Sequence, residues 1–204
     1  MKIYDIAQEV FGCVVYPGDP SPERKIMLKI EDGAVCNLTA FQMCAHNGTH
    51  VDAPYHFFKD GKTIEQVALN KFVGYAYVAS HEGQVTLDVA KDIYAKAKEA
   101  SKNSNNPDCD CYNRILVKEN SEMTEEAAKY LVDNGILLYG NESQTVGPEN
   151  APMAVHLIML GAEVVLLEGI RLAEIPEGVY LLNSAPINLS GSDGAPARPI
   201  LISL

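Results

Sequence analysis

The 204-residue sequence predicts one mixed α/β (α+β) domain that spans residues 1–204. Strand-like segments separated by turn residues fill its N-terminal part, and helix-like segments alternate with strand-like ones after that, which is the order typical of this class. No linker or low-complexity tract divides the chain. A chain of 22.2 kDa is large enough to bury roughly 70% of its unfolded surface, so a substantial core is expected.

The N-terminal part alternates between strands and turns. Residues 2–10, KIYDIAQEV, alternate in polarity and predict a strand. Residues 16–24, YPGDPSPER, contain three prolines and one glycine and predict a loop that could border a site. Residues 24–50 predict two strands joined near Asp32-Gly33, a dipeptide that favours positive φ. The second of these strands leads toward a group of histidines.

Helices alternate with strands over the rest of the chain. Apolar residues recur at helical spacing in residues 87–100, so one side of that helix is expected to face the core. Thr124 is a suitable N-cap for the next helix. In chain order, the later segments are a strand at 114–119, a helix at 123–136, a strand at 137–142, a helix at 152–161, and strands at 163–168, 179–189 and 199–204.

The charge balance argues against polyanionic partners. A formal net charge of −11 repels nucleic acid and anionic lipid, and no cluster of lysine and arginine offsets it. No apolar run approaches the length of a membrane span, and the first residues lack a continuous apolar signal core. We therefore expect a cytoplasmic protein that binds a small-molecule substrate, with no nucleic-acid partner and no membrane partner.

The cysteines are expected to be free thiols. Five cysteines, an odd number, do not make a complete set of intramolecular disulfides, and a chain of this length does not need them. Cys109 and Cys111 lie close together in the segment DCDC. The interpretation we favour is an exposed loop with incidental cysteines, and a soft-metal or redox site is the alternative.

Three of the five histidines lie in residues 46–57, HNGTHVDAPYHF. In an extended segment His46, His50 and Asp52 share one face, because side chains alternate with period two. A straight strand would hold the first two Cα atoms about 13 Å apart, so a bend is expected at Gly48, where positive φ is tolerated. Imidazole and carboxylate groups are ligands of divalent metals, so the segment predicts a metal site. Separate, hydrogen-bonded histidines on a polar loop are the alternative.

Three further residues are candidates for the same site. His56 follows Pro54, which takes the chain out of regular pairing and lets this histidine approach from another direction. His156 lies on the apolar stripe of MAVHLIML, and Glu168 ends the apolar strand EVVLLE. Burying either is costly unless it is paired or binds a cation. A core histidine and a glutamate at the solvent edge are the alternatives.

The pattern His-x-Gly-Thr-His-x-Asp-x-Pro-x-His is unbroken from His46 to His56 and resembles the cyclase-like metal-dependent hydrolase family that includes bacterial kynurenine formamidase. The segments YDI and YPGDP, the helix TEEAAKYLVDNGI, the segment from His156 to Glu168 and the closing GSDGAPARPILI are also similar, in the same order. The resemblance therefore covers most of the chain. It implies a swivelling β/β/α domain that forms a homodimer or a higher homo-oligomer.

The resemblance also implies a metal centre with one or two divalent ions per chain. Zinc is the metal we expect, with manganese as the alternative. His56 would be the catalytic proton donor and acceptor. The implied ligands are His46, His50 and Asp52 for a first ion, and His156 and Glu168 for a second ion that shares Asp52.

The implied activity is that of a metal-dependent amidohydrolase, with N-formylkynurenine as the best single substrate and kynurenine and formate as products. A divalent ion supplies hydroxide near neutral pH, and His56 could pass a proton to the departing nitrogen. Tyr16 stands where the family usually has a tryptophan, and it is expected to line the substrate site; the chain has no tryptophan. The family's G-x-Asp-Thr loop reads GNESQTVGPEN here, so the pocket is expected to differ around Asn141. The alternatives are hydrolysis of an isatin-like cyclic amide or a lactone, or a non-catalytic metal-binding or ligand-binding protein.

Overall fold

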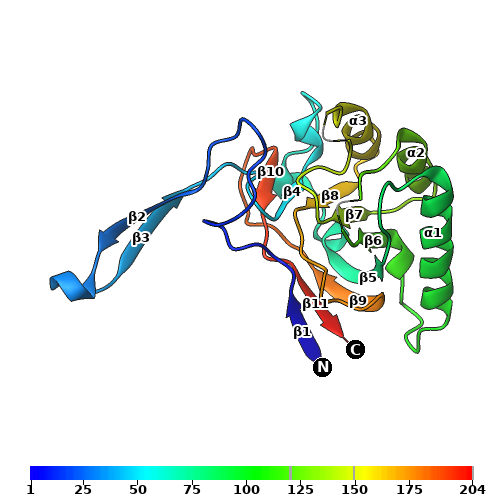
Figure 1. Ribbon diagram of the computed structural model, residues 1–204, viewed down its shortest axis with the longest axis horizontal. Coiled ribbons are helices and arrows are strands. Elements are labelled where there is room, and N and C mark those ends of the chain that lie inside the picture. The colour runs from blue at the N-terminus through cyan, green and yellow to red at the C-terminus, as the bar shows by residue number, and fades with distance from the viewer. Residues whose placement is uncertain (120, 149, 204) are drawn as a thin grey trace.

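The computed structural model describes residues 1–119, 121–148 and 150–203, which form a mixed α/β fold around a large β-sheet (Figure 1). Four central strands of this sheet run parallel, and the strands on either side are antiparallel to their neighbours. The predicted mixed α/β class is confirmed. The spatial order is β1 (Lys2–Asp5), β11 (Ile200–Ser203), β9 (Gly178–Asn183), β5 (Val73–Ala79), β6 (Arg114–Val117), β7 (Leu138–Asn141), β8 (Val165–Glu168), β4 (His50–Asp52) and β10 (Gly194–Pro196).

Three helices lie side by side along one face of the sheet: α1 (Leu87–Lys102), α2 (Glu125–Asp133) and α3 (Met153–Gly161) (Figure 1). The Thr124 side chain accepts a hydrogen bond from the backbone of Ala127, which confirms the predicted N-cap of α2. Within the described residues, none of the helices combines the length and apolar character needed to cross a membrane. The short 3-10 helices are η1 (Ile30–Asp32), η2 (Pro54–His56), η3 (Ile64–Gln66), η4 (Leu69–Lys71) and η5 (Cys111–Asn113).

Two hydrophobic clusters cover the two faces of the sheet. The first joins the three helices to residues such as Ile115 and Tyr139. The second contains Leu201 of β11, near one end of the strand order, together with Val51 of β4 and Ala195 of β10 at the other end. Strands so far apart in the order share a core because the sheet curls around it. Strand pairing places β4, with its histidine and aspartate, between β8 and β10.

A second, two-stranded sheet projects away from the body of the molecule (Figure 1). It consists of β2 (Glu23–Leu28) and β3 (Leu38–Gln42), joined through η1 and Gly33, whose φ is 87°. The hairpin predicted near Asp32-Gly33 is therefore confirmed. We call residues 23–42 the arm; every residue of its two strands is exposed to solvent.

The expectation of an exposed loop around the paired cysteines is wrong. Cys109 and Cys111 are both buried, against α1 and its neighbours. The Cys111 thiol donates a hydrogen bond to the carbonyl of Ala97 at 3.3 Å, and burial raises its pKa to about 12. These thiols are core residues because the loop after α1 folds back against the helix. All five cysteines are free, as predicted.

Candidate metal centre and adjoining cavity

A turn before β4 gathers the first three predicted ligands. Gly48 has a φ of 64°, and the bend places His46 Nδ1 2.9 Å from Asp52 Oδ1. His50 Nε2 lies 3.4 Å from the same oxygen. A Cβ on residue 48 would lie 2.8 Å from the Cβ of Cys13, so glycine is required for both its conformation and its size. The predicted bend is confirmed, although regular strand begins only at His50.

Two distant elements complete the cluster. β4 and β8 pair antiparallel with His50 opposite Glu168, and the Oε2 of this glutamate lies 3.4 Å from His50 Nε2. His156, on α3, has its Nε2 3.2 Å from Glu168 Oε1 and 3.6 Å from Asp52 Oδ2. Glu168 is 2% exposed, so the alternative of a glutamate at the solvent edge is wrong. The strand register and the helix together bring both residues to the cluster.

Asp193 joins the cluster and was missed in the sequence analysis. It directly precedes β10, in which Gly194 pairs with Asp52. Its Oδ2 lies 2.8 Å from His46 Nε2 and 3.2 Å from His56 Nδ1. In the sequence this aspartate belongs to GSDGAP, which has the composition of a turn. The one sequence signal for Asp193 was that a carboxylate lies near the start of GSDGAPARPILI, a segment similar to the family. Its place in the cluster, however, depends on a long-range strand pairing.

His56 occupies the rim of the cluster. It lies on η2, which begins at Pro54, and its ring centroid is 4.1 Å from that of His46. Its side chain is 29% exposed, whereas the other three imidazoles of the cluster are 13% exposed or less. His56 is therefore the imidazole with the easiest access to a ligand from solvent.

The buried carboxylates attract positive charge. Burial alone would raise the pKa of Asp52, but hydrogen bonds with His46 and His50 outweigh it and hold this pKa well below its usual range. Burial alone would lower the pKa of His46, yet its hydrogen bonds to Asp193 and Asp52 raise it to about 11. The same balance raises the pKa of His50 to about 9. The buried carboxylates therefore favour a positive charge in their immediate surroundings.

The donor atoms fit a divalent cation. Imidazole nitrogens and carboxylate oxygens are the ligands that zinc and related metals prefer. Asp52 is central, because its Oδ1 faces two imidazoles and its Oδ2 faces a third. Two groups of three residues could each hold a metal ion, because within each group the ligand atoms all lie within 4.8 Å of one another. One group is His46, Asp52 and His56, and the other is His50, Asp52 and Glu168.

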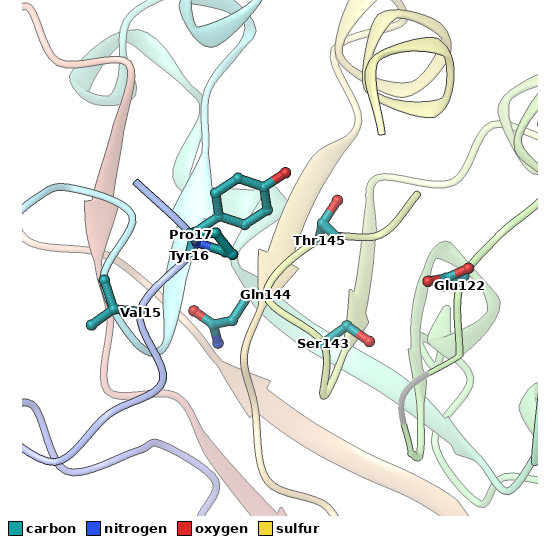
Figure 2. A pocket seen from close by; sticks show the side chains of 7 residues that line it. All are labelled: Val15, Tyr16, Pro17, Glu122, Ser143, Gln144 and Thr145. Atoms are coloured by element: carbon teal, nitrogen blue, oxygen red, sulfur yellow. The ribbon is translucent and has the colours of Figure 1, made fainter. Parts of the chain in front are cut away.

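A cavity of about 200 Å³ lies between the N-terminal loop and the loop that follows β7. Tyr16 lines it, so the residue expected at the substrate site borders a cavity. Figure 2 shows Tyr16 and Thr145 on facing walls, with both hydroxyl groups pointing toward the same side. The lining residues are Val15, Tyr16, Pro17, Glu122, Ser143, Gln144 and Thr145.

Hydrogen bonds tie both walls of the cavity to the histidine cluster. On one side, the Gly48 amide donates to the carbonyl of Val14 at 3.3 Å, two residues before Tyr16. On the other side, the Val146 amide donates to Glu168 Oε1 at 2.9 Å, directly after the wall residue Thr145. Each wall of the cavity is therefore held next to a residue of the cluster.

The loop after β7 presents polar groups to the cavity. Thr145 is 6% exposed, and neither its hydroxyl nor the side-chain amide of Gln144 has a hydrogen-bond partner among the residues that the structure describes. Asn141, which the sequence analysis linked to a changed pocket, is buried behind this loop and donates to the carbonyls of Ser121 and Thr145. Buried polar groups without partners are uncommon in folded proteins, so a polar ligand would satisfy those that line the cavity.

A curled mixed sheet, a buried cluster of imidazoles and carboxylates, and an adjoining cavity are the features of a metal-dependent hydrolase. The chain belongs to the family described as "Putative cyclase", which matches residues 4–148. The resemblance inferred from the histidine pattern is therefore confirmed.

Full-length relatives agree with this assignment. The chain is 28% identical to the kynurenine formamidase of Salinibacter ruber over 98% of its own length and 97% of the relative. It is also similar to the structure of a predicted metal-dependent hydrolase from Bacillus stearothermophilus, with 28% identity, a TM-score of 0.77 and coverage of 98% and 97%. Isatin hydrolase A from Labrenzia aggregata shares the fold, with a TM-score of 0.79, 18% identity and coverage of 100% and 94%.

Proposed function

We propose that this protein hydrolyses a small amide in a metal-dependent reaction, with N-formylkynurenine as the substrate and kynurenine and formate as products. The observation that carries the proposal is the position of Asp52, a buried carboxylate in contact with three imidazoles next to a cavity with an aromatic wall. The similarity to the Salinibacter ruber kynurenine formamidase supports the choice of substrate.

The proposed metal centre takes one or two divalent ions, zinc first and manganese as the alternative. When bound, such an ion lowers the pKa of a water molecule toward neutrality and polarises a carbonyl group. The shared role of Asp52 is supported by its two oxygens, which face different imidazoles. The proposed ligands are His46, His50 and Asp52 for the first ion, and Asp52, Glu168 and His156 for the second.

His56 is the proposed proton donor and acceptor. Asp193 Oδ2 lies 3.2 Å from its Nδ1, so the carboxylate keeps a proton on that nitrogen and leaves Nε2 for exchange with the substrate. In this role Nε2 would accept a proton from the water that attacks the carbonyl carbon and return it to the amine nitrogen as the C–N bond breaks. Because Asp193 also contacts His46, one carboxylate orients both the proposed catalytic histidine and a proposed ligand.

The cavity suits a small aromatic substrate. Its volume of about 200 Å³ lies below the roughly 300–1,000 Å³ of pockets that take drug-sized ligands. The Tyr16 ring offers a face on which an aryl ring can stack. The Thr145 hydroxyl and the Gln144 amide offer hydrogen bonds to polar substituents. Tyr16 is therefore proposed to bind the aryl part of the substrate.

Three further assignments are proposals on the same basis. Residues 1–204 are proposed to form one domain, because no linker divides the chain. The protein is proposed to act in the cytoplasm, in line with its acidic composition. It is also proposed to be a homodimer or a higher homo-oligomer, as the family resemblance implies.

Formate release from N-formylkynurenine tests the proposed reaction. Metal-loaded and chelator-stripped protein would be compared, with the metal content determined on the same samples. The proposal predicts rapid release by the loaded protein only. No release from a fully loaded site would exclude this substrate, and isatin and simple lactones would then be assayed. Failure to hydrolyse any of these compounds at full occupancy would favour a non-catalytic metal-binding protein.

A further inference from the structure

A second cavity, of about 510 Å³, adjoins the cavity that Tyr16 lines. The two cavities are adjacent because Ser143 and Gln144, in the loop after β7, line both of them. The polar atoms of the Gln144 side chain are buried and have no hydrogen-bond partner among the residues that the structure describes. Since buried amides without partners are uncommon, a polar ligand group at the boundary between the cavities would satisfy this side chain.

Arg171 contributes a positive charge to the second cavity. Its Nη1 donates to the carbonyl of Ile170 at 2.8 Å and to that of Glu142 at 3.2 Å, so neutral acceptors hold this nitrogen. Among the residues that the structure describes, Arg114 and Arg198 are paired with aspartates, whereas Arg171 is paired with no carboxylate. Its guanidinium group is therefore in place to receive a carboxylate from a ligand, a pairing that suits its planar fork.

The same cavity also carries negative charge. Glu142 lines it and is half-buried. The carboxylate of Glu142 accepts hydrogen bonds from the backbone amide of Leu172, at 2.7 Å, and from that of Glu119. These bonds fix its position, and its remaining lone pairs can accept from an ammonium group. A wall that presents a guanidinium group and a fixed carboxylate favours a ligand part that carries both charges over a simple anion or cation.

The chain holds Arg171 close to the proposed metal centre. Arg171 follows the proposed ligand Glu168 by three residues, so their Cα atoms are at most roughly 11 Å apart. Gly169, between them, has a φ of 69° and donates to the carbonyl of Ser143 at 2.7 Å. A Cβ on residue 169 would clash with Gln144 Nε2, so this turn requires glycine. The turn therefore keeps the end of β8, the boundary amide and the arginine together.

We propose that the second cavity binds the α-amino-acid part of the substrate, with Arg171 paired with its carboxylate and Glu142 with its ammonium group. The inference rests on the proposed function. N-formylkynurenine is an aryl formamide whose ring also carries an amino-acid side chain. With the formamide at the metal centre and the ring on Tyr16, this side chain is the part that remains for the second cavity. Arg171 and Glu142 then distinguish an amino-acid formamide from a simple aryl formamide.

Two pairs of compounds that differ only in the amino-acid part test the inference on metal-loaded protein. The substrates are N-formylkynurenine and 2-formamidoacetophenone, compared by kcat/KM. The products are kynurenine and 2-aminoacetophenone, compared by Kd in calorimetry. Arg171→Met should reduce the preference for the amino-acid compound about tenfold in both pairs, mainly through KM and Kd, because a charge-assisted pair is lost. The lower end of the usual range is expected because Arg171 is exposed and water screens its charge.

Two further variants serve as controls. Arg171→Lys keeps the positive charge and should recover part of the lost preference; no recovery would overturn the assignment to charge. Arg24→Met removes an arginine from β2, outside both cavities, and should leave both preferences as in the parent. An equal loss in Arg24→Met and Arg171→Met would contradict the assignment to this cavity.

The binding measurement separates this inference from the proposed reaction. A parent that hydrolyses neither formamide but binds kynurenine through Arg171 would exclude the reaction and support the binding site. A parent that hydrolyses both formamides, with the same preference in folded Arg171→Met, would support the reaction and overturn the inference. A parent that shows no preference for the amino-acid compound in either pair would overturn it as well.

Discussion

Replacing Asp193 with asparagine removes one negative charge that two histidines share. The carboxylate oxygen lies 2.8 Å from His46 Nε2 and 3.2 Å from His56 Nδ1. These contacts hold the pKa of Asp193 below its usual range, with the His46 hydrogen bond as the largest cause. An asparagine side chain has nearly the same shape, but it is neutral and can turn its amide donor toward either ring. The substitution thus changes charge and hydrogen-bond polarity with little change in volume.

The expected loss of activity follows from these contacts. Removing a carboxylate that orients a metal-binding or catalytic histidine commonly reduces affinity or activity about 10- to 100-fold. The Asp193 side chain is 41% exposed, so water partly screens its charge, but it contacts two functional rings. We therefore expect a middle value of about 30-fold in kcat/KM, equivalent to about 2 kcal/mol of transition-state stabilisation.

Steady-state hydrolysis of N-formylkynurenine would measure the effect of the substitution on catalysis, and calorimetry would measure its effect on metal affinity. A loss mainly in kcat with normal metal affinity would place the effect at His56, and a loss of affinity would place it at His46. Asp88→Asn is a suitable control, because that side chain is 95% exposed. Activity within about twofold of the parent, with unchanged metal affinity, would refute the positioning role of Asp193.

Three further predictions concern proton transfer, metal binding and stability. His56→Ala should retain metal while hydrolysis falls about 10²- to 10⁴-fold, and retained turnover would remove the proton-transfer role. Glu168→Gln should weaken metal binding by more than about tenfold in calorimetry, whereas Glu126→Gln, at an exposed position of α2, should not; equal affinities would exclude Glu168 as a ligand. Thr124→Ala removes the N-cap bond to Ala127 and should lower the free energy of unfolding by about 1 kcal/mol, with a fall in Tm of about 2–4 °C. A thermal scan that shows no change would contradict the capping contribution.

Local signals explain why much of the fold could be predicted. The N-cap of α2, the turn at Gly33 and the alternation of helices and strands depend on residues close together in sequence. The meeting of His46, His50 and Asp52 also follows from local geometry, because period two and one flexible glycine bring them together. For these features, the spacing of the residues in the sequence is enough to predict the local structure.

Long-range pairing explains what the sequence could not reveal. Asp193 enters the site because the three-residue strand β10 pairs with β4, and so short a strand carries no clear pattern. The positions of His156 and Glu168 followed only from the family resemblance, since spacing alone left a core histidine and an exposed glutamate open. A hairpin was predicted for the arm, but its separation from the body was not, because alternation looks the same whether a strand is packed or free.

Metal titration of chelator-stripped protein, followed by formate release from N-formylkynurenine, tests the central claim most directly. The proposed centre predicts negligible activity before zinc or manganese is added, and then a rise that ends at one or two equivalents per chain. His50→Ala should remove this rise, because the structure places His50 in contact with both Asp52 and Glu168. Full hydrolysis by protein that contains no metal would contradict the account.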